Sequence, residues 1–147
     1  MARVTERHTA VQVGIRNLSA DEAALVRQGR HNLFFAHEMA ADPGWMDRVL
    51  GLLRGNVYLT IDLDAFDPSF MPAVGTPEPG GLGWYETLRF LRRVATQCRI
   101  VAMDVVELCP IPGNVVSDFT AAKLAYRLIG YVLAASSSPS PLGRGRG

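Results

Sequence analysis

The sequence has 147 residues, a length typical of one folded domain. Hydrophobic residues make up 48% and charged residues 20%, so there is enough apolar material for a packed core and too little charge for a disordered chain. The net charge of +1 gives no field to attract nucleic acid or an anionic membrane, and no apolar run reaches the about 20 residues that span a bilayer. Two cysteines without zinc-site spacing favour a reducing, cytoplasmic setting.

Four short runs rich in β-branched and aromatic residues predict strands, and each is followed by a helical pattern. The predicted strands are residues 10–16, 32–36, 56–62 and 99–106. The predicted helices run from Ser19 to about Gly29, from Asp42-Pro43 through Leu53, from Trp84 to Thr96, and from Ser117 or Asp118 to about Ala134. Ser19 and Glu22 match a capping box, and Asp42-Pro43 matches an N-cap followed by the first helical position.

The alternation βαβαβαβα predicts an α/β fold with a parallel sheet flanked by helices. Strand 56–62 is apolar almost throughout, which predicts burial on both faces. The single domain should cover residues 1–135, and the Ser/Pro/Gly/Arg-rich segment 136–147 is expected to be a disordered tail.

Two aspartates follow strand 56–62, where the carboxyl ends of parallel strands usually carry the ligand site. Asp62 and Asp64 are two residues apart, so in an extended chain they point the same way. Two such carboxylates favour a hard divalent cation such as Mg²⁺ or Mn²⁺ between them. Equally, one aspartate can cap a turn while the other is solvated.

Glu107 follows strand 99–106 at the same edge, where it either binds a cationic group such as a guanidinium or is a solvated loop acid. Asp104 lies within that strand and is expected to have a structural hydrogen-bonding role. Between the two strands lies a long loop that contains residues 75–81 (GTPEPGG), whose prolines and glycines favour a defined shape.

Together these motifs resemble the ureohydrolase family, which contains arginase and agmatinase. The matching patterns are Asp62-x-Asp64-x-x-Asp67-Pro68, Gly75-Thr76-Pro77-x-x-Gly80-Gly81-Leu82 and Asp104-x-x-Glu107-x-x-Pro110. Residues 11–16 (VQVGIR) also resemble a family strand, and the similarity covers about residues 10–134. The Pro-Glu-Pro variant of the loop is more similar to agmatinase than to arginase.

The resemblance implies half of a three-layer arginase-like sandwich. It implies hydrolysis of a guanidino group at two Mn²⁺ ions, as in the conversion of agmatine to putrescine and urea. In that scheme Asp62 bridges both metals, and Asp64 holds one of them. Glu107 holds the guanidinium of the small-molecule substrate, Thr76 lines the site, and Asp67 braces the loop.

The family's remaining metal ligands come from Gly-Gly-Asp-His and Asp-Ala-His-x-Asp stretches, and neither occurs in this sequence. His8, His31 and His37 lie outside any metal-ligand pattern, and the family's general-acid histidine has no counterpart. We therefore expect the C-terminal half of a ureohydrolase, inactive and poorly soluble alone, whose partner is the N-terminal half or a homo-oligomer. The resemblance also implies that a strand of the absent half lies between the first pair of strands and the second.

Two other functions fit parts of the sequence. A D-x-D after a strand also occurs in Mg²⁺-dependent phosphatases of the haloacid-dehalogenase type, which need a later lysine. Lys123, predicted in the middle of a helix, fits that role poorly. The absent ligands also allow a non-catalytic paralogue that serves as a subunit or regulator.

Overall fold

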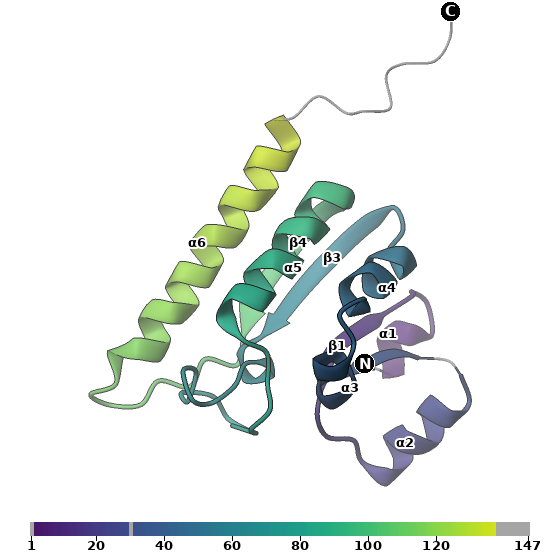
Figure 1. Cartoon of the computed structure of the whole chain (residues 1–147), viewed down its shortest axis with the longest axis horizontal. Coiled ribbons are helices and arrows are strands. Elements are labelled where there is room, and N and C mark those ends of the chain that lie inside the picture. Colours follow the sequence, from purple (N-terminus) through teal and green to yellow (C-terminus); the bar gives the residue numbers. More distant parts are fainter. Residues whose placement is uncertain (1, 30, 138–147) are drawn as a thin grey trace, which may run out of the picture.

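Figure 1 shows the computed structural model of the chain, which describes residues 2–29 and 31–137. The strands are β1 (Val11–Ile15), β2 (Asn32–Phe35), β3 (Asn56–Asp62) and β4 (Arg99–Val106). The helices are α1 (Ala2–Thr5), α2 (Ala20–Arg27), α3 (Ala36–Ala41), α4 (Trp45–Leu52), α5 (Trp84–Gln97) and α6 (Val115–Ser137), with a 3₁₀ turn η1 (Leu63–Ala65) after β3. All four predicted strands are therefore confirmed, and β3 and β4 have the predicted bounds.

The strands form two parallel pairs instead of one continuous sheet. β1 pairs with β2, and β3 pairs with β4. The predicted arrangement of parallel strands flanked by helices is confirmed, but no ladder joins the two pairs within the described residues. In the second pair, Thr60 lies opposite Asp104 and Asp62 opposite Val106, so both strands end at the same edge.

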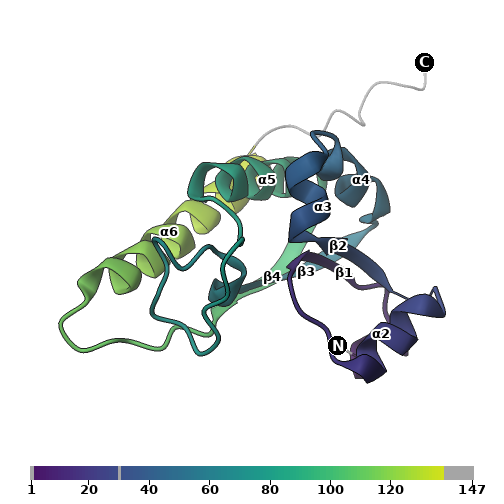
Figure 2. The same cartoon turned by 60° about the horizontal axis from the view of Figure 1, so that its bottom comes forward.

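Helices α3, α4, α5 and α6 lie on one side of the strands and α2 lies on the other (Figure 2). The core forms between β3 and the first group of helices, and its most buried side chains are Val49, Leu63, Phe66, Met71, Val94, Leu124 and Leu128. The other face of β3 is exposed at Tyr58, Thr60 and Asp62. The prediction that β3 is buried on both faces is wrong, because the helices that follow β3 and β4 cover only one face.

Helix boundaries differ from the sequence prediction in three places. Asp42 does not cap the second predicted helix: it ends the unpredicted helix α3, and its Oδ1 accepts a hydrogen bond from Gly44 N at 2.8 Å. Helix α6 begins at Val115, and Asn114 precedes it in place of the expected Ser117 or Asp118, because the side chain of Asn114 accepts from Val116 N at 3.0 Å. It also continues through Ser137, and the rest of the expected tail lies outside the described residues.

The capping box at Ser19 is confirmed. Ser19 Oγ accepts from Glu22 N at 3.2 Å, and the Glu22 carboxylate accepts from Ser19 N at 2.9 Å. No helix among the described residues is both long and apolar enough to cross a membrane.

Candidate active site at the carboxyl ends of β3 and β4

Asp62 is the last residue of β3 and Asp64 lies in the following turn η1, so both lie at the edge of the second strand pair. Leu63 between them is fully buried, and the chain turns there into η1. Asp62 is the N-cap of η1, and its Oδ1 accepts from Asp64 N at 3.1 Å. Of the two alternatives for this pair, turn capping therefore applies to Asp62.

The carboxylate of Asp64 is held by the loop that joins β3 to α5. Thr76 Oγ1 donates a hydrogen bond to Asp64 Oδ2 at 2.6 Å. This contact joins the D-x-D motif to the Gly-Thr-Pro motif across twelve residues of sequence. It fixes one oxygen of Asp64, so Asp64 is not simply a solvated acid.

Glu107, the first residue after β4, has a left-handed backbone with φ of 68°. A non-glycine residue in this region carries a cost of order 1–2 kcal/mol, and such residues often occur at functional sites. Its position is fixed by its neighbours, since Leu108 forms a bridge with Val74 and Cys109 N donates to Ala73 O at 2.9 Å. The loop passes so close that a Cβ built on Gly75 would lie 3.5 Å from Glu107 Oε2.

Asp67 connects the turn after β3 to the far end of the loop. Its Oδ1 accepts from Ser69 N and its Oδ2 from Gly80 N, both at 2.9 Å. Hydrogen bonds from Ser69, Gly80 and Gly81 lower the pKa of Asp67, so the bracing carboxylate is ionised at neutral pH. Gly81 packs so tightly that a Cβ there would lie 2.6 Å from Asp67 N.

The acidic side chains at this edge repel one another. Partial desolvation raises the pKa of Asp62, and the charges of Asp64 and Glu107 raise it further, against the lowering effect of the hydrogen bond from Asp64 N. This electrostatic pattern favours binding of a cation. Asp104 lies on β4 opposite Thr60, two residues before the partner of Asp62. Hydrogen bonds from Thr60 and Tyr58 lower the pKa of Asp104, in keeping with its predicted structural role.

The donors present do not complete a binuclear metal centre. No group of three or more His, Cys, Asp or Glu side chains among the described residues has the geometry of a metal site. An Mn²⁺ ion prefers about six hard donors, and a pair of ions needs correspondingly more. Asp62 and Asp64 therefore fit part of such a centre, and the described residues do not supply the remainder.

Arg16 is a residue of this region that the sequence prediction did not include. Its Nη1 donates to Gly14 O at 2.9 Å and to Ala65 O at 3.3 Å, and its Nη2 donates to Asp64 O. The guanidinium thus ties the end of β1 to the turn that carries Asp64. Its position in the sequence could have predicted this, because Arg16 follows a parallel strand at the carboxyl edge of the sheet, where ligand sites form.

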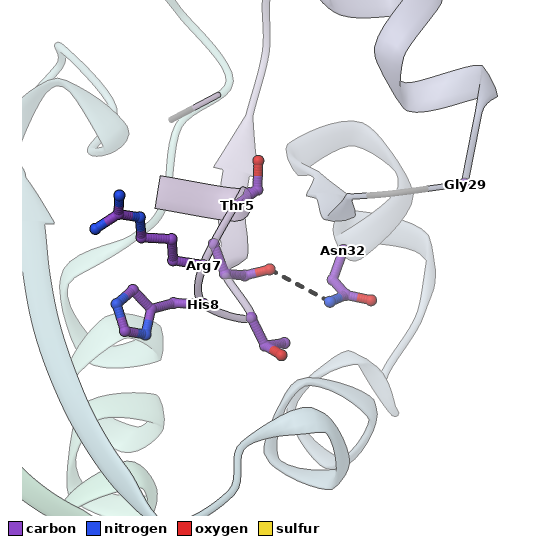
Figure 3. A pocket seen from close by; sticks show the side chains of 7 residues that line it. Thr5, Arg7, His8, Gly29 and Asn32 are labelled. Carbon is purple, nitrogen blue, oxygen red and sulfur yellow. Dashed lines mark hydrogen bonds between the residues drawn. The ribbon is translucent and has the colours of Figure 1, made fainter. Parts of the chain in front are cut away.

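A separate hollow of about 320 Å³ lies near the N-terminus and contains none of these carboxylates. Figure 3 shows it between the segment Thr5–Ala10 and the residues Gly29 and Asn32. Asn32 Nδ2 donates to Ala10 O at 3.3 Å, and the side chains of Arg7 and His8 point away from this bond. The residues that line this hollow include His8 and no carboxylate.

Comparison with known proteins identifies the relatives of this chain. The family model described as "Arginase family" matches residues 1–130. The chain is 49% identical over 120 residues to the N(1)-aminopropylagmatine ureohydrolase of Synechocystis sp., covering 81% of this chain and 39% of that protein. It is 42% identical over 127 residues to the protein of the same name from Thermus thermophilus, covering 86% and 43%.

The fold has solved counterparts as well. The arginase of Bacillus caldovelox superposes with a TM-score of 0.73 at 29% identity, covering 82% of this chain and 42% of that chain. This chain thus spans about two fifths of the length of the relatives it matches. The match over nearly the whole chain shows that it belongs to the arginase family.

Proposed function

We propose that this chain supplies one part of a ureohydrolase active site, which hydrolyses the guanidino group of an agmatine-type amine to urea and the free amine. The observation that carries the proposal is the convergence of Asp62, Asp64, Thr76 and Glu107 at one edge of the β3–β4 pair. The edge is acidic and open, because Asp62, Thr76 and Glu107 are all exposed. It can therefore bind both a metal and a cationic substrate.

The carboxylate of Glu107 and the names of the relatives support a guanidino compound as the substrate. A carboxylate accepts two parallel hydrogen bonds from a guanidinium, and the exposed Glu107 at this edge is available for them. The most similar relatives reported above are named for N(1)-aminopropylagmatine, so this compound and agmatine are the two substrates to compare.

The cofactor in this proposal is a pair of Mn²⁺ ions, which Asp62 and Asp64 would help to hold. Divalent cations in hydrolytic enzymes activate water and polarise the group under attack. The further donors belong to an N-terminal part of the enzyme, which also supplies a strand between the two pairs. Among residues 2–29 and 31–137 no ladder joins β1–β2 to β3–β4, and this supports two pairs separated by such a strand.

No observation favours the phosphatase alternative. Lys123, the lysine that it would require beside Asp62, is exposed on α6. We place the proposed reaction in the cytoplasm, a reducing compartment that suits the unpaired thiols of Cys98 and Cys109.

The test is reconstitution of the enzyme from two parts. The chain is co-expressed with the amino-terminal portion of the Synechocystis relative that lies outside the match, and the purified complex is assayed with Mn²⁺ for urea release. We expect urea from agmatine or N(1)-aminopropylagmatine, loss of activity in Asp62→Asn, and full activity in the control Asp21→Asn on α2. A folded two-part complex that releases no urea from either compound would overturn the proposal in favour of a non-catalytic subunit.

A further inference from the structure

Ser117 has a buried side chain that forms a hydrogen bond outside its own helix. The sequence predicted Ser117 or Asp118 as the cap of the last helix, but Ser117 is the third residue of α6 and is 0% exposed. Its Oγ accepts a hydrogen bond from Ala73 N at 3.2 Å, across 44 residues of sequence. The bond joins the first turn of α6 to the loop between β3 and α5 (Figure 1).

This use of a buried hydroxyl differs from that of Thr87, the other polar residue that is buried in the part of the chain that the structure describes. Thr87 Oγ1 donates to Gly83 O at 3.0 Å, at the start of its own helix, α5. Such a bond satisfies the hydroxyl locally and holds no other segment. Ser117 instead accepts from a backbone N–H that would otherwise be buried without this partner, since Ala73 is also 0% exposed.

Ala73 connects this hydrogen bond to the chain that follows β4. Val74 N donates to Pro72 O at 3.0 Å, so Ala73 is the middle residue of a γ-turn, and the turn uses neither its N–H nor its C=O. The N–H donates to Ser117, and the C=O accepts from Cys109 N at 2.9 Å. The two backbone groups of one residue therefore join α6 to the segment after β4.

That segment directly follows the acid proposed to bind the substrate. The left-handed backbone of Glu107, with φ of 68°, is disfavoured for a residue with a side chain, so it persists only where neighbouring contacts impose it. Those contacts are the bridge between Leu108 and Val74 and the hydrogen bond from Cys109 N to Ala73 O. Both contacts use the γ-turn that the buried serine of α6 holds.

We propose that Ser117 is a positioning residue of the ureohydrolase site: through Ala73 it holds Glu107, the acid proposed to bind the guanidinium, in its left-handed backbone conformation. The inference rests on the proposed function for the role of Glu107, but every contact in it lies within this chain. Loss of the Ser117 hydroxyl should therefore weaken substrate binding by a larger factor than it weakens Mn²⁺ binding.

The first test is amide hydrogen exchange, measured by NMR on the chain alone. In Ser117→Ala, the exchange rate of the Cys109 amide should rise at least ~10-fold relative to that of Val94, a buried residue of α5. Ser117→Cys fills the same space with a weaker acceptor, should give a smaller change in the same direction, and serves as the test if the alanine variant does not fold. The matched control is Thr87→Val, which removes the other buried hydroxyl and should not raise the rate for Cys109 relative to Val94. If the two amides change alike in the Ser117 variants, as for a general loss of stability, the proposal is overturned.

The second test uses the two-part complex with Mn²⁺. Ser117→Ala should raise KM for agmatine ~10-fold while kcat falls less than ~3-fold, because the residue acts through the group that binds substrate. Thr87→Val should leave KM unchanged. An active complex in which the two variants have the same KM would overturn the proposal. A folded complex that releases no urea would contradict the proposed function instead, and the exchange rates would still decide whether Ser117 holds the backbone at Glu107.

Discussion

The guanidinium of Arg16, just past the end of β1, donates a hydrogen bond to the backbone carbonyl of Asp64, just past the end of β3. Since no ladder joins the two strand pairs in the part of the chain that the structure describes, this side chain is a direct polar link between them. It holds the turn through backbone atoms, so the Asp64 carboxylate remains free to meet Thr76. The position of the acidic edge therefore depends on a residue from the other pair of strands.

Removing this link should destabilise the fold. Arg16→Gln should lower the free energy of unfolding by about 1.5–3 kcal/mol, because it removes charge-assisted hydrogen bonds to Gly14, Asp64 and Ala65. Arg16→Lys should recover only part of this loss, since an ammonium cannot reproduce the planar fork. Urea denaturation measures the effect, with Arg92→Gln, an exposed residue of α5, as the control. Equal stability of Arg16→Gln and the control would show that Arg16 does not join the two pairs.

Gly81 is required by close packing of the loop against the turn after β3. A Cβ at this position would lie 2.6 Å from Asp67 N and nearer still to the Phe66 carbonyl, so Gly81→Ala should cost about 1–3 kcal/mol. The matched control is Gly51→Ala on α4, where a Cβ meets nothing within 4 Å. Alanine there should raise the free energy of unfolding by about 0.5–1 kcal/mol. The midpoint temperature of thermal denaturation should therefore fall for Gly81→Ala and rise for Gly51→Ala. A shift in the same direction would refute the packing argument.

The raised pKa of Asp62 predicts a pH-dependent stability. Because the folded state keeps this proton to a higher pH than the unfolded state, folding loses stability as the pH rises from the ordinary value of 3.8 through the raised pKa. Asp62→Asn removes this loss and can still accept the hydrogen bond from Asp64 N. The variant should thus match the parent in acid and exceed it in stability at neutral pH. Denaturation at a series of pH values checks this, and a variant less stable than the parent at neutral pH would contradict it.

The hydroxyl of Thr76 should matter for activity in the reconstituted enzyme. Thr76→Val removes the donor to Asp64 Oδ2 at 2.6 Å, and loss of a hydrogen bond that orients a metal ligand typically costs about 10–100-fold in activity or metal affinity. Thr76→Ser keeps the hydroxyl and should retain most of the activity. The comparison is made by urea release at saturating and limiting Mn²⁺. Equal activity in Thr76→Val and Thr76→Ser would show that this contact has no part in the site.

The sequence predicts β3 and β4 to the residue because their β-branched runs are bounded by clear turn signals. It also predicts that Asp62, Asp64 and Glu107 lie at a common edge, which follows from parallel pairing alone. Helix α3 is not predicted because its six residues lack a periodic apolar pattern and directly follow a strand.

Other features depend on contacts that no local pattern contains. The exposed face of β3 could not be predicted from its apolar composition, since exposure there depends on which helices cover the strand pair. The contact of Arg16 with Asp64 spans 48 residues of sequence and links two separate strand pairs. The left-handed backbone of Glu107 is likewise set by the flanking contacts of Leu108 and Cys109 with the loop.

The central claim is that Asp62 and Asp64 form one portion of a two-metal centre whose other ligands come from outside this chain. Its most direct test is the Mn²⁺ stoichiometry of the chain alone and of the two-part complex, measured by equilibrium dialysis with metal analysis. We predict no tightly bound Mn²⁺ for the chain alone and two ions per complex, with both lost in Asp62→Asn. Two tightly held ions on the chain alone, or none on a folded complex, would contradict the account.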